Sequence, residues 1–75
     1  VGGGMTPTLL REAGVALYGP RWQSDLARDL GVSDRTVRRW DAGQNGIPAG
    51  VWVELRTLTK TRSMALAAVR RRLPR

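Results

Sequence analysis

Residues 23–42 read QSDLARDLGVSDRTVRRWDA, and this stretch decides the fold. Two short runs carry apolar residues at helical spacing, and Gly31 and Ser33 lie between them. Glycine permits a turn with positive φ, and serine caps a helix by accepting a hydrogen bond from its first free amides. Ala27 is small enough to let two helices approach closely, and the apolar wedge between them would consist of Leu26, Leu30, Val32, Val37 and Trp40. The stretch therefore predicts two helices joined by a tight turn.

The pattern resembles the helix-turn-helix of the phage repressor and Cro-like regulators, also called the XRE family. The resemblance extends from about residue 9 to residue 58, and the matching residues are Gln23, Ala27, Gly31, Ser33, Val37 and Trp40. It implies an all-α fold, a small bundle of four or five helices with a central helix-turn-helix, like that of the lambda repressor. Beyond Ser63 the resemblance gives no guidance.

Helical spacing continues on both sides of the motif. Thr6 and Pro7 predict the cap and first position of a helix that ends at Gly19-Pro20. The other expected elements are helices over residues 22–30 and 34–42, a loop over 41–46, and a further helix from Ile47-Pro48. Poor helix formers predict a break near residues 60–63; they are Thr57, Thr59, Thr61 and Ser63. Residues 48–73 would therefore form either one long bent helix or two.

The chain has 75 residues, enough for one small domain. Residues 1–5 read VGGGM and are interpreted as a disordered cloning remnant followed by an initiator methionine. Residues 6–62 would form the helix-turn-helix domain. Residues 63–75 would form a basic C-terminal helix and a candidate dimerisation segment.

Composition excludes several classes of protein. There is no cysteine and no histidine, which rules out disulfides, Cys/His zinc sites and catalysis that depends on imidazole. No acid pair or nucleophile–base pair stands out, so we expect no enzyme, metal, cofactor or small-molecule ligand. No apolar run approaches the roughly 20 residues that span a bilayer. We therefore expect no membrane partner. The resemblance implies a cytoplasmic, nucleoid-associated protein that a bacterium or a phage encodes.

Charge is distributed unevenly along the chain, whose net charge is +7. Residues 1–33 hold three basic and three acidic residues, so residues 34–75, with ten basic and three acidic residues, carry the whole excess. Twelve of the 13 basic residues are arginine, whose planar fork pairs with phosphate and with guanine edges. This asymmetry favours a polyanionic partner, and together with the motif it predicts double-stranded DNA. The alternative is a basic surface that serves only solubility.

The resemblance also implies which residues touch DNA, because the second helix of this motif lies in the major groove. The outward positions of helix 34–42 would contact bases, and they are Asp34, Arg35, Arg38 and Arg39. Arg35 is expected to form two hydrogen bonds with guanine, while Arg38 and Arg39 divide between bases and phosphates. The Asp34 carboxylate would either accept from cytosine N4 or hold Arg38 one turn further on, and we favour the second.

Phosphate contacts are implied for a second group of residues: Gln23, Ser33, Thr36, Gln44 and Asn45. Gln23 matches a family residue that binds phosphate and also braces the helix that reads the bases. Ser33 is primarily a helix cap. The aromatic residues are expected to serve the core, with Trp40 buried and Trp22 and Trp52 partly buried.

The C-terminal segment carries an apolar stripe that needs a cover, formed by Ala65, Leu66, Val69 and Leu73. A second copy would cover it in a homodimer, and the expected interface residues are Trp52, Leu66, Val69 and Leu73. The alternative folds the stripe back on the first helix. The arginines at 70–72 and 75 would form a solvated helix end, attract DNA or, least favoured, bind a membrane surface.

The leading functional hypothesis is a repressor that binds an inverted-repeat operator as a homodimer. The alternative is a helix-turn-helix fold used as a protein-interaction module.

Overall fold

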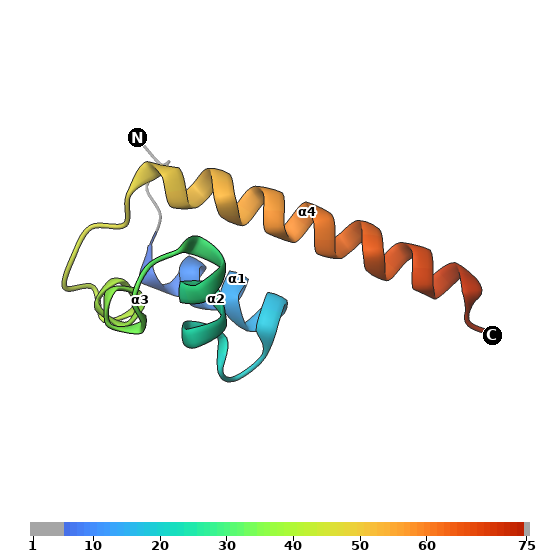
Figure 1. Cartoon of the computed structure of the whole chain (residues 1–75), viewed down its shortest axis with the longest axis horizontal. Coiled ribbons are helices and arrows are strands. Elements are labelled where there is room, and N and C mark those ends of the chain that lie inside the picture. Colours follow the sequence, from blue (N-terminus) through green and yellow to red (C-terminus); the bar gives the residue numbers. More distant parts are fainter. Residues whose placement is uncertain (1–5, 75) are drawn as a thin grey trace.

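The computed structural model describes residues 6–74, and the expected cloning remnant at residues 1–5 lies outside the described residues. The described chain is all-helical, as predicted, and forms a small four-helix bundle (Figure 1). The helices are α1 (Pro7–Tyr18), α2 (Trp22–Leu30), α3 (Asp34–Asp41) and α4 (Ala49–Arg72). The two helices predicted from residues 23–42 are α2 and α3, and α3 ends one residue earlier than expected.

Two predicted helix starts, those of α1 and α3, are confirmed by their caps, whereas α4 begins at Ala49, just after the predicted Ile47-Pro48. Thr6 Oγ1 accepts a hydrogen bond from the amide of Leu9 at 3.1 Å, with proline at the first helical position. Ser33 Oγ accepts from the amide of Thr36 at 3.2 Å, so it caps α3 as expected. Between α2 and α3, Gly31 has φ +73°, a left-handed conformation that a residue with a Cβ rarely adopts.

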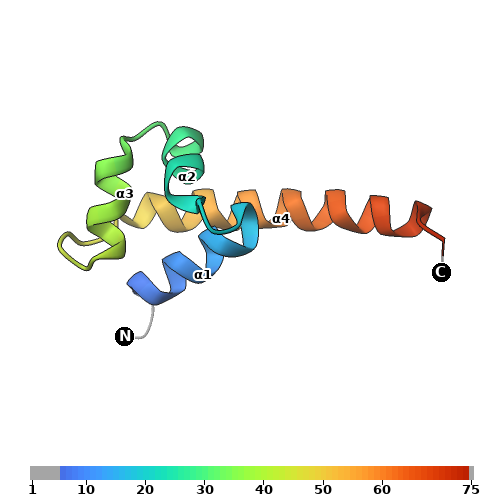
Figure 2. The same ribbon diagram turned by 90° about the horizontal axis from the view of Figure 1, so that it is seen from below.

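The core lies where α1 packs against the other three helices and α2 packs against α3. Its buried apolar residues are Leu10, Leu17, Trp22, Leu26, Ala27, Val37, Trp40, Val51 and Leu55. Burial of a side chain such as Leu26, which is fully enclosed, contributes about 1.5–3 kcal/mol to folding. Figure 2 shows α1, α2 and α3 gathered against the first half of α4.

Two burial predictions are wrong. Val32 is 36 % exposed and does not belong to the wedge between α2 and α3, because it sits in the turn and points to solvent. Trp22 is only 4 % exposed rather than partly buried. The ring of Trp22 occupies the space that a side chain at Gly14 would need, so α1 and α2 pack closely around the ring.

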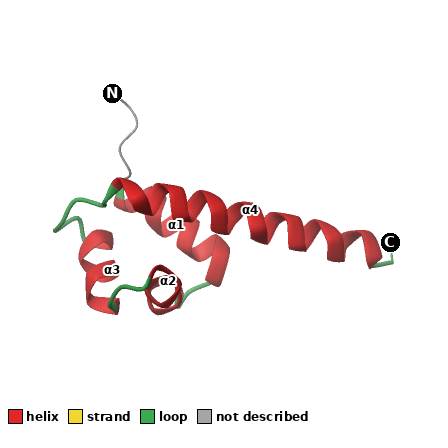
Figure 3. Ribbon diagram, turned by 45° about the horizontal axis from the view of Figure 1, so that its top comes forward, coloured by secondary structure: helices red, strands yellow, loops and turns green. Residues whose placement is uncertain are grey.

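α4 is one continuous helix of 24 residues, which decides between the two alternatives for residues 48–73. The expected break is absent, and the hydroxyl of Thr59 is accommodated inside the helix. Thr59 Oγ1 donates to the carbonyl oxygen of Leu55 at 2.8 Å and contacts that of Arg56 at 3.0 Å. The second half of α4 continues past the bundle as a projecting arm (Figures 1 and 3). The arm consists of residues 60–73, all of which are exposed, although Leu66 lines an open hollow with Ala16 and Leu17 at the end of α1.

Candidate nucleic-acid interface

α3 presents three arginines to solvent. Val37 and Trp40 are buried and hold the helix against the core, which leaves Arg35, Arg38 and Arg39 on its outer side. The three arginines, together with Ala42 and Gln44, line an open concave surface. Among the described residues, the ion pairs are Arg11–Asp41 and Arg28–Asp25, so none of these three guanidinium charges is neutralised. The chain thus carries a concentrated positive surface on the solvent-facing side of α3.

Asp34, at the start of α3, does not hold Arg38 with its carboxylate as we expected. Its Oδ2 accepts a hydrogen bond from Ser24 Oγ at 2.7 Å, which joins α3 to α2. Arg38 Nε instead donates to the backbone oxygen of Asp34 at 3.5 Å. The serine hydroxyl lies closer to the carboxylate than the arginine does, so the guanidinium of Arg38 is left to point outward.

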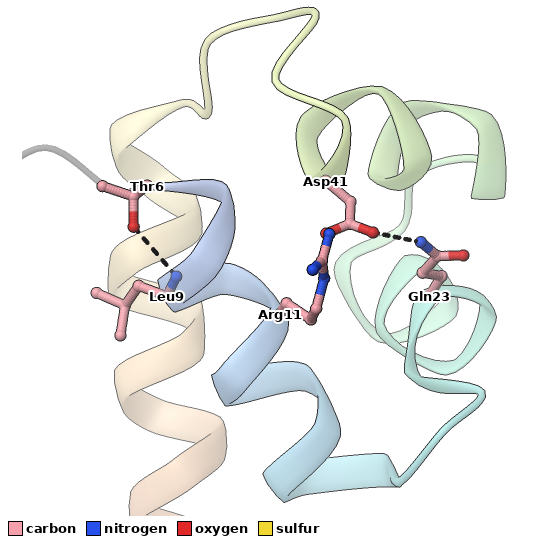
Figure 4. Close-up of polar contacts among 5 residues, drawn as sticks. All are labelled: Thr6, Leu9, Arg11, Gln23 and Asp41. Carbon is pink, nitrogen blue, oxygen red and sulfur yellow. Dashed lines mark hydrogen bonds and ion pairs between the residues drawn. The ribbon is translucent and has the colours of Figure 1, made fainter.

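Asp41, at the other end of α3, is a meeting point of three helices (Figure 4). Its Oδ1 accepts from Arg11 Nε of α1 at 3.0 Å, and its Oδ2 accepts from Gln23 Nε2 of α2 at 2.8 Å. The side chain of Asp41 is 14 % exposed, against 59 % for Arg11. Gln23 therefore braces α3, as the resemblance implied, and its partner is Asp41.

Sequence reasoning missed Arg11 and Asp41, because it placed Asp41 in the loop after α3. One signal was present: a carboxylate at a helix C-terminus opposes the helix dipole, so its position calls for a compensating partner.

The other expected phosphate-binding residues lie around the same surface. Ser33 and Thr36 share a hydrogen bond between their hydroxyls at 2.9 Å, at the first turn of α3. Gln44 and Asn45 are exposed in the loop after α3, and Gln44 lines the arginine surface. All four thus occupy positions from which a polyanion on α3 could be reached.

Tyr18 ties the end of α1 to α2. Burial raises its pKa above the usual range, and the hydrogen bond that its hydroxyl donates to Asp29 Oδ2 at 2.6 Å raises it further. The phenol therefore stays protonated at neutral pH and keeps its role as donor.

The residues expected at the dimer interface lie at two separate places along the C-terminal part of the chain. Leu66, Val69 and Leu73 are exposed along the arm, at 60 %, 50 % and 62 %. Trp52 is half-buried and lies beside Leu9 and Ala13 of α1. It is about 26 Å along the helix from Val69 at 1.5 Å per residue, so Trp52 does not join the exposed patch.

Within residues 6–74, no helix is both long enough and apolar enough to cross a membrane. In the same range, no three carboxylate, cysteine or histidine side chains gather as a metal site would require. Comparison with protein-family models, curated proteins and solved structures finds no match to this chain.

Proposed function

We propose that the chain binds double-stranded DNA sequence-specifically and acts as a transcriptional regulator. The observation that carries this proposal is the outer face of α3, where Arg35, Arg38 and Arg39 stand unneutralised on a helix that Val37 and Trp40 anchor from behind. An α-helix fits into the major groove of DNA, and an arginine guanidinium can donate two hydrogen bonds to the O6 and N7 acceptors of guanine.

Phosphates would be bound around the edges of this face, by the first turn of α3, the start of α2 and the loop at Gln44 and Asn45. Gln23 donates one amide hydrogen to Asp41 and has a second one available for a phosphate oxygen. A DNA partner places the protein with the chromosome, in the cytoplasm of a bacterium or a phage-infected cell.

One eight-residue helix spans few base pairs, so we propose that two copies bind the halves of an inverted repeat, with their α3 helices ~34 Å apart. Occupying such a site blocks or recruits polymerase by position, and repression is the simpler outcome. The arm offers a surface for pairing, because Leu66 and Val69 lie on one side of α4, Leu73 follows directly after its last residue, and all three are exposed.

Arg35→Ala tests the reading of bases. Once a preferred duplex has been selected from a random pool, the variant is expected to lose ~1–3 kcal/mol of binding free energy on that duplex and to relax the preference at one base pair of each half-site. Fluorescence anisotropy with the selected duplex and single-base variants measures both effects.

Arg56→Ala is the matched control, because Arg56 is an exposed arginine on α4 and its removal changes the net charge equally. If Arg35→Ala weakens preferred and random duplexes by the same factor, Arg35 contacts phosphate and does not read a base.

Leu66→Glu and Val69→Glu test the pairing of two copies. Each puts a charge into the apolar patch and is expected to convert a dimer at micromolar concentration into a monomer in sedimentation velocity. Met64→Glu is the control, because Met64 is equally exposed, at 65 %, and lies on the other side of the helix from Leu66. If the wild-type chain is monomeric in solution yet binds a palindrome cooperatively, the two copies pair only when they are bound to DNA.

The same exposed patch is the observation that favours a second candidate, a protein-interaction module that uses the arm to dock another protein. A chain that selects no preferred duplex but retains a partner through Leu66 and Val69 would support this candidate in place of DNA binding.

A further inference from the structure

The two carboxylates of α3 stand at its first and last residues, and both are bonded to the first turn of α2. Ser24 donates to Asp34 at 2.7 Å, and the neighbouring residue Gln23 donates to Asp41 at 2.8 Å. Arg11 adds a contact to Asp41 from α1 at 3.0 Å. α3 is thus attached to the bundle by directional hydrogen bonds at both of its ends.

The negative charges of these carboxylates contrast with the positive charge of the rest of the α3 surface. The other charged residues of α3 are three arginines, and a carboxylate close to a polyanion is repelled. Asp41 also opposes the helix dipole, because it sits at the C-terminal end of α3. Both carboxylates weaken the positive charge of this face. Asp34 is favoured by the helix dipole at the N-terminus of α3, but Asp41 has no such benefit, and what the two share is a hydrogen bond to α2.

The buried apolar contacts of α3 come from one side of the helix, where Val37 and Trp40 enter the core. Val37 and Trp40 press the helix against the core through a single stripe, and hydrophobic contact has no preferred direction. Hydrogen bonds at two points about 10 Å apart along the axis, at 1.5 Å rise per residue, resist both roll and tilt. The carboxylates therefore add a directional constraint at each end of α3 to the packing of its apolar side.

We propose that Asp34 and Asp41 are positioning residues that set the rotation of α3 and thereby aim its arginines, an inference that rests on the proposed DNA-binding function. At about 5–6 Å from the helix axis, a roll of about 20° moves a side chain by about 2 Å. That displacement exceeds the tolerance of a two-bond arginine–guanine pair, whose distances vary by only about 0.5 Å. Asp34 then acts through α2 and does not itself accept a hydrogen bond from a base.

The first test separates positioning from simple charge. Asp41→Ala and Asp34→Ala each remove a negative charge, which by itself strengthens binding to every duplex. A positioning role predicts, in addition, that the preference for the selected duplex over random DNA falls about tenfold or more, as when one base contact is lost. Asp41→Asn is expected to retain most of the preference, because the Gln23 amide can turn to accept from the new amide while Arg11 keeps its acceptor.

Asp25→Ala is the matched control, since Asp25 pairs with Arg28 within α2 and, among the described residues, has no hydrogen bond or ion pair with α3. It removes the same charge and is expected to leave the preference unchanged. Affinities are compared at a temperature where circular dichroism shows every variant folded. An unchanged preference in both Asp34→Ala and Asp41→Ala would overturn the proposal.

The second test needs no DNA. Residual dipolar couplings of the full chain report the orientation of α3 relative to α1 and α2, and Asp41→Ala is expected to shift that orientation while Asp25→Ala leaves it fixed. An unmoved α3 overturns the positioning role whatever the binding data show. If Asp41→Ala reorients α3 but the wild-type chain selects no duplex, the proposed DNA-binding function is wrong. The conclusion that Asp41 sets the orientation of α3 would still hold.

Discussion

Affinity for the selected duplex is expected to fall by about 10³–10⁵-fold between about 50 and 200 mM salt, if a pair of copies makes about 6–10 phosphate contacts. The physical reason is counterion release, because each contact between a cation and a phosphate frees an ion from the DNA. The net charge of +7 and the uncompensated arginines of α3 supply enough cations for that number of contacts. Anisotropy titrations at a series of potassium chloride concentrations give the slope directly.

Self-association without DNA is expected to respond to the same salt series in the opposite direction. The arm carries Lys60, Arg62 and the arginines at 70–72, and no acidic residue follows Glu54. Two paired arms therefore repel each other, and raising the salt shortens the Debye length to about 10 Å at 0.1 M and screens that repulsion. Sedimentation should show a tighter dimer at higher salt. In the DNA titrations, an affinity that does not change with salt would contradict the nucleic-acid proposal. The protein-interaction module would then be the remaining candidate function.

Local chemistry accounts for the part of the fold that was predicted from sequence. Thr6, Gly31 and Ser33 act on residues within one turn of themselves, through caps and a positive φ, so their effect can be recognised without knowing the rest of the structure. The apolar spacing that identified Val37 and Trp40 as core residues is equally local. The outward face of α3, and hence the arginine surface, follows from that spacing.

Contacts between distant residues account for what was missed. Asp41 finds its partners 18 and 30 residues away, in α2 and α1, and nothing in its neighbourhood in the sequence identifies them. The carboxylate of Asp34 had two possible partners within reach, and only the packing of α2 against α3 decides for Ser24. The continuity of α4 across several poor helix formers could not be predicted either, because helix propensity is weak enough for the rest of the structure to override it.

Gly14→Ala is expected to destabilise the protein, although alanine is the better helix former. Gly14 is buried in the middle of α1, and a Cβ there would overlap the ring of Trp22, which is itself only 4 % exposed. Overpacking costs up to about 3 kcal/mol, whereas helix propensity returns about 1 kcal/mol, so the free energy of unfolding falls by about 2 kcal/mol. In a domain of this size Tm drops by about 10 °C, which thermal denaturation followed by circular dichroism measures.

Gly50→Ala makes the same chemical change with the opposite expected sign. Gly50 lies in the first turn of α4, has no positive φ, and has open space where a Cβ would be, so alanine should stabilise by up to about 1 kcal/mol. Trp22→Leu then identifies the cause, because a smaller side chain leaves room for a methyl group at position 14. Gly14→Ala should cost less in the Trp22→Leu background than in the wild type. Equal costs in both backgrounds would show that the ring of Trp22 is not the reason why position 14 needs glycine.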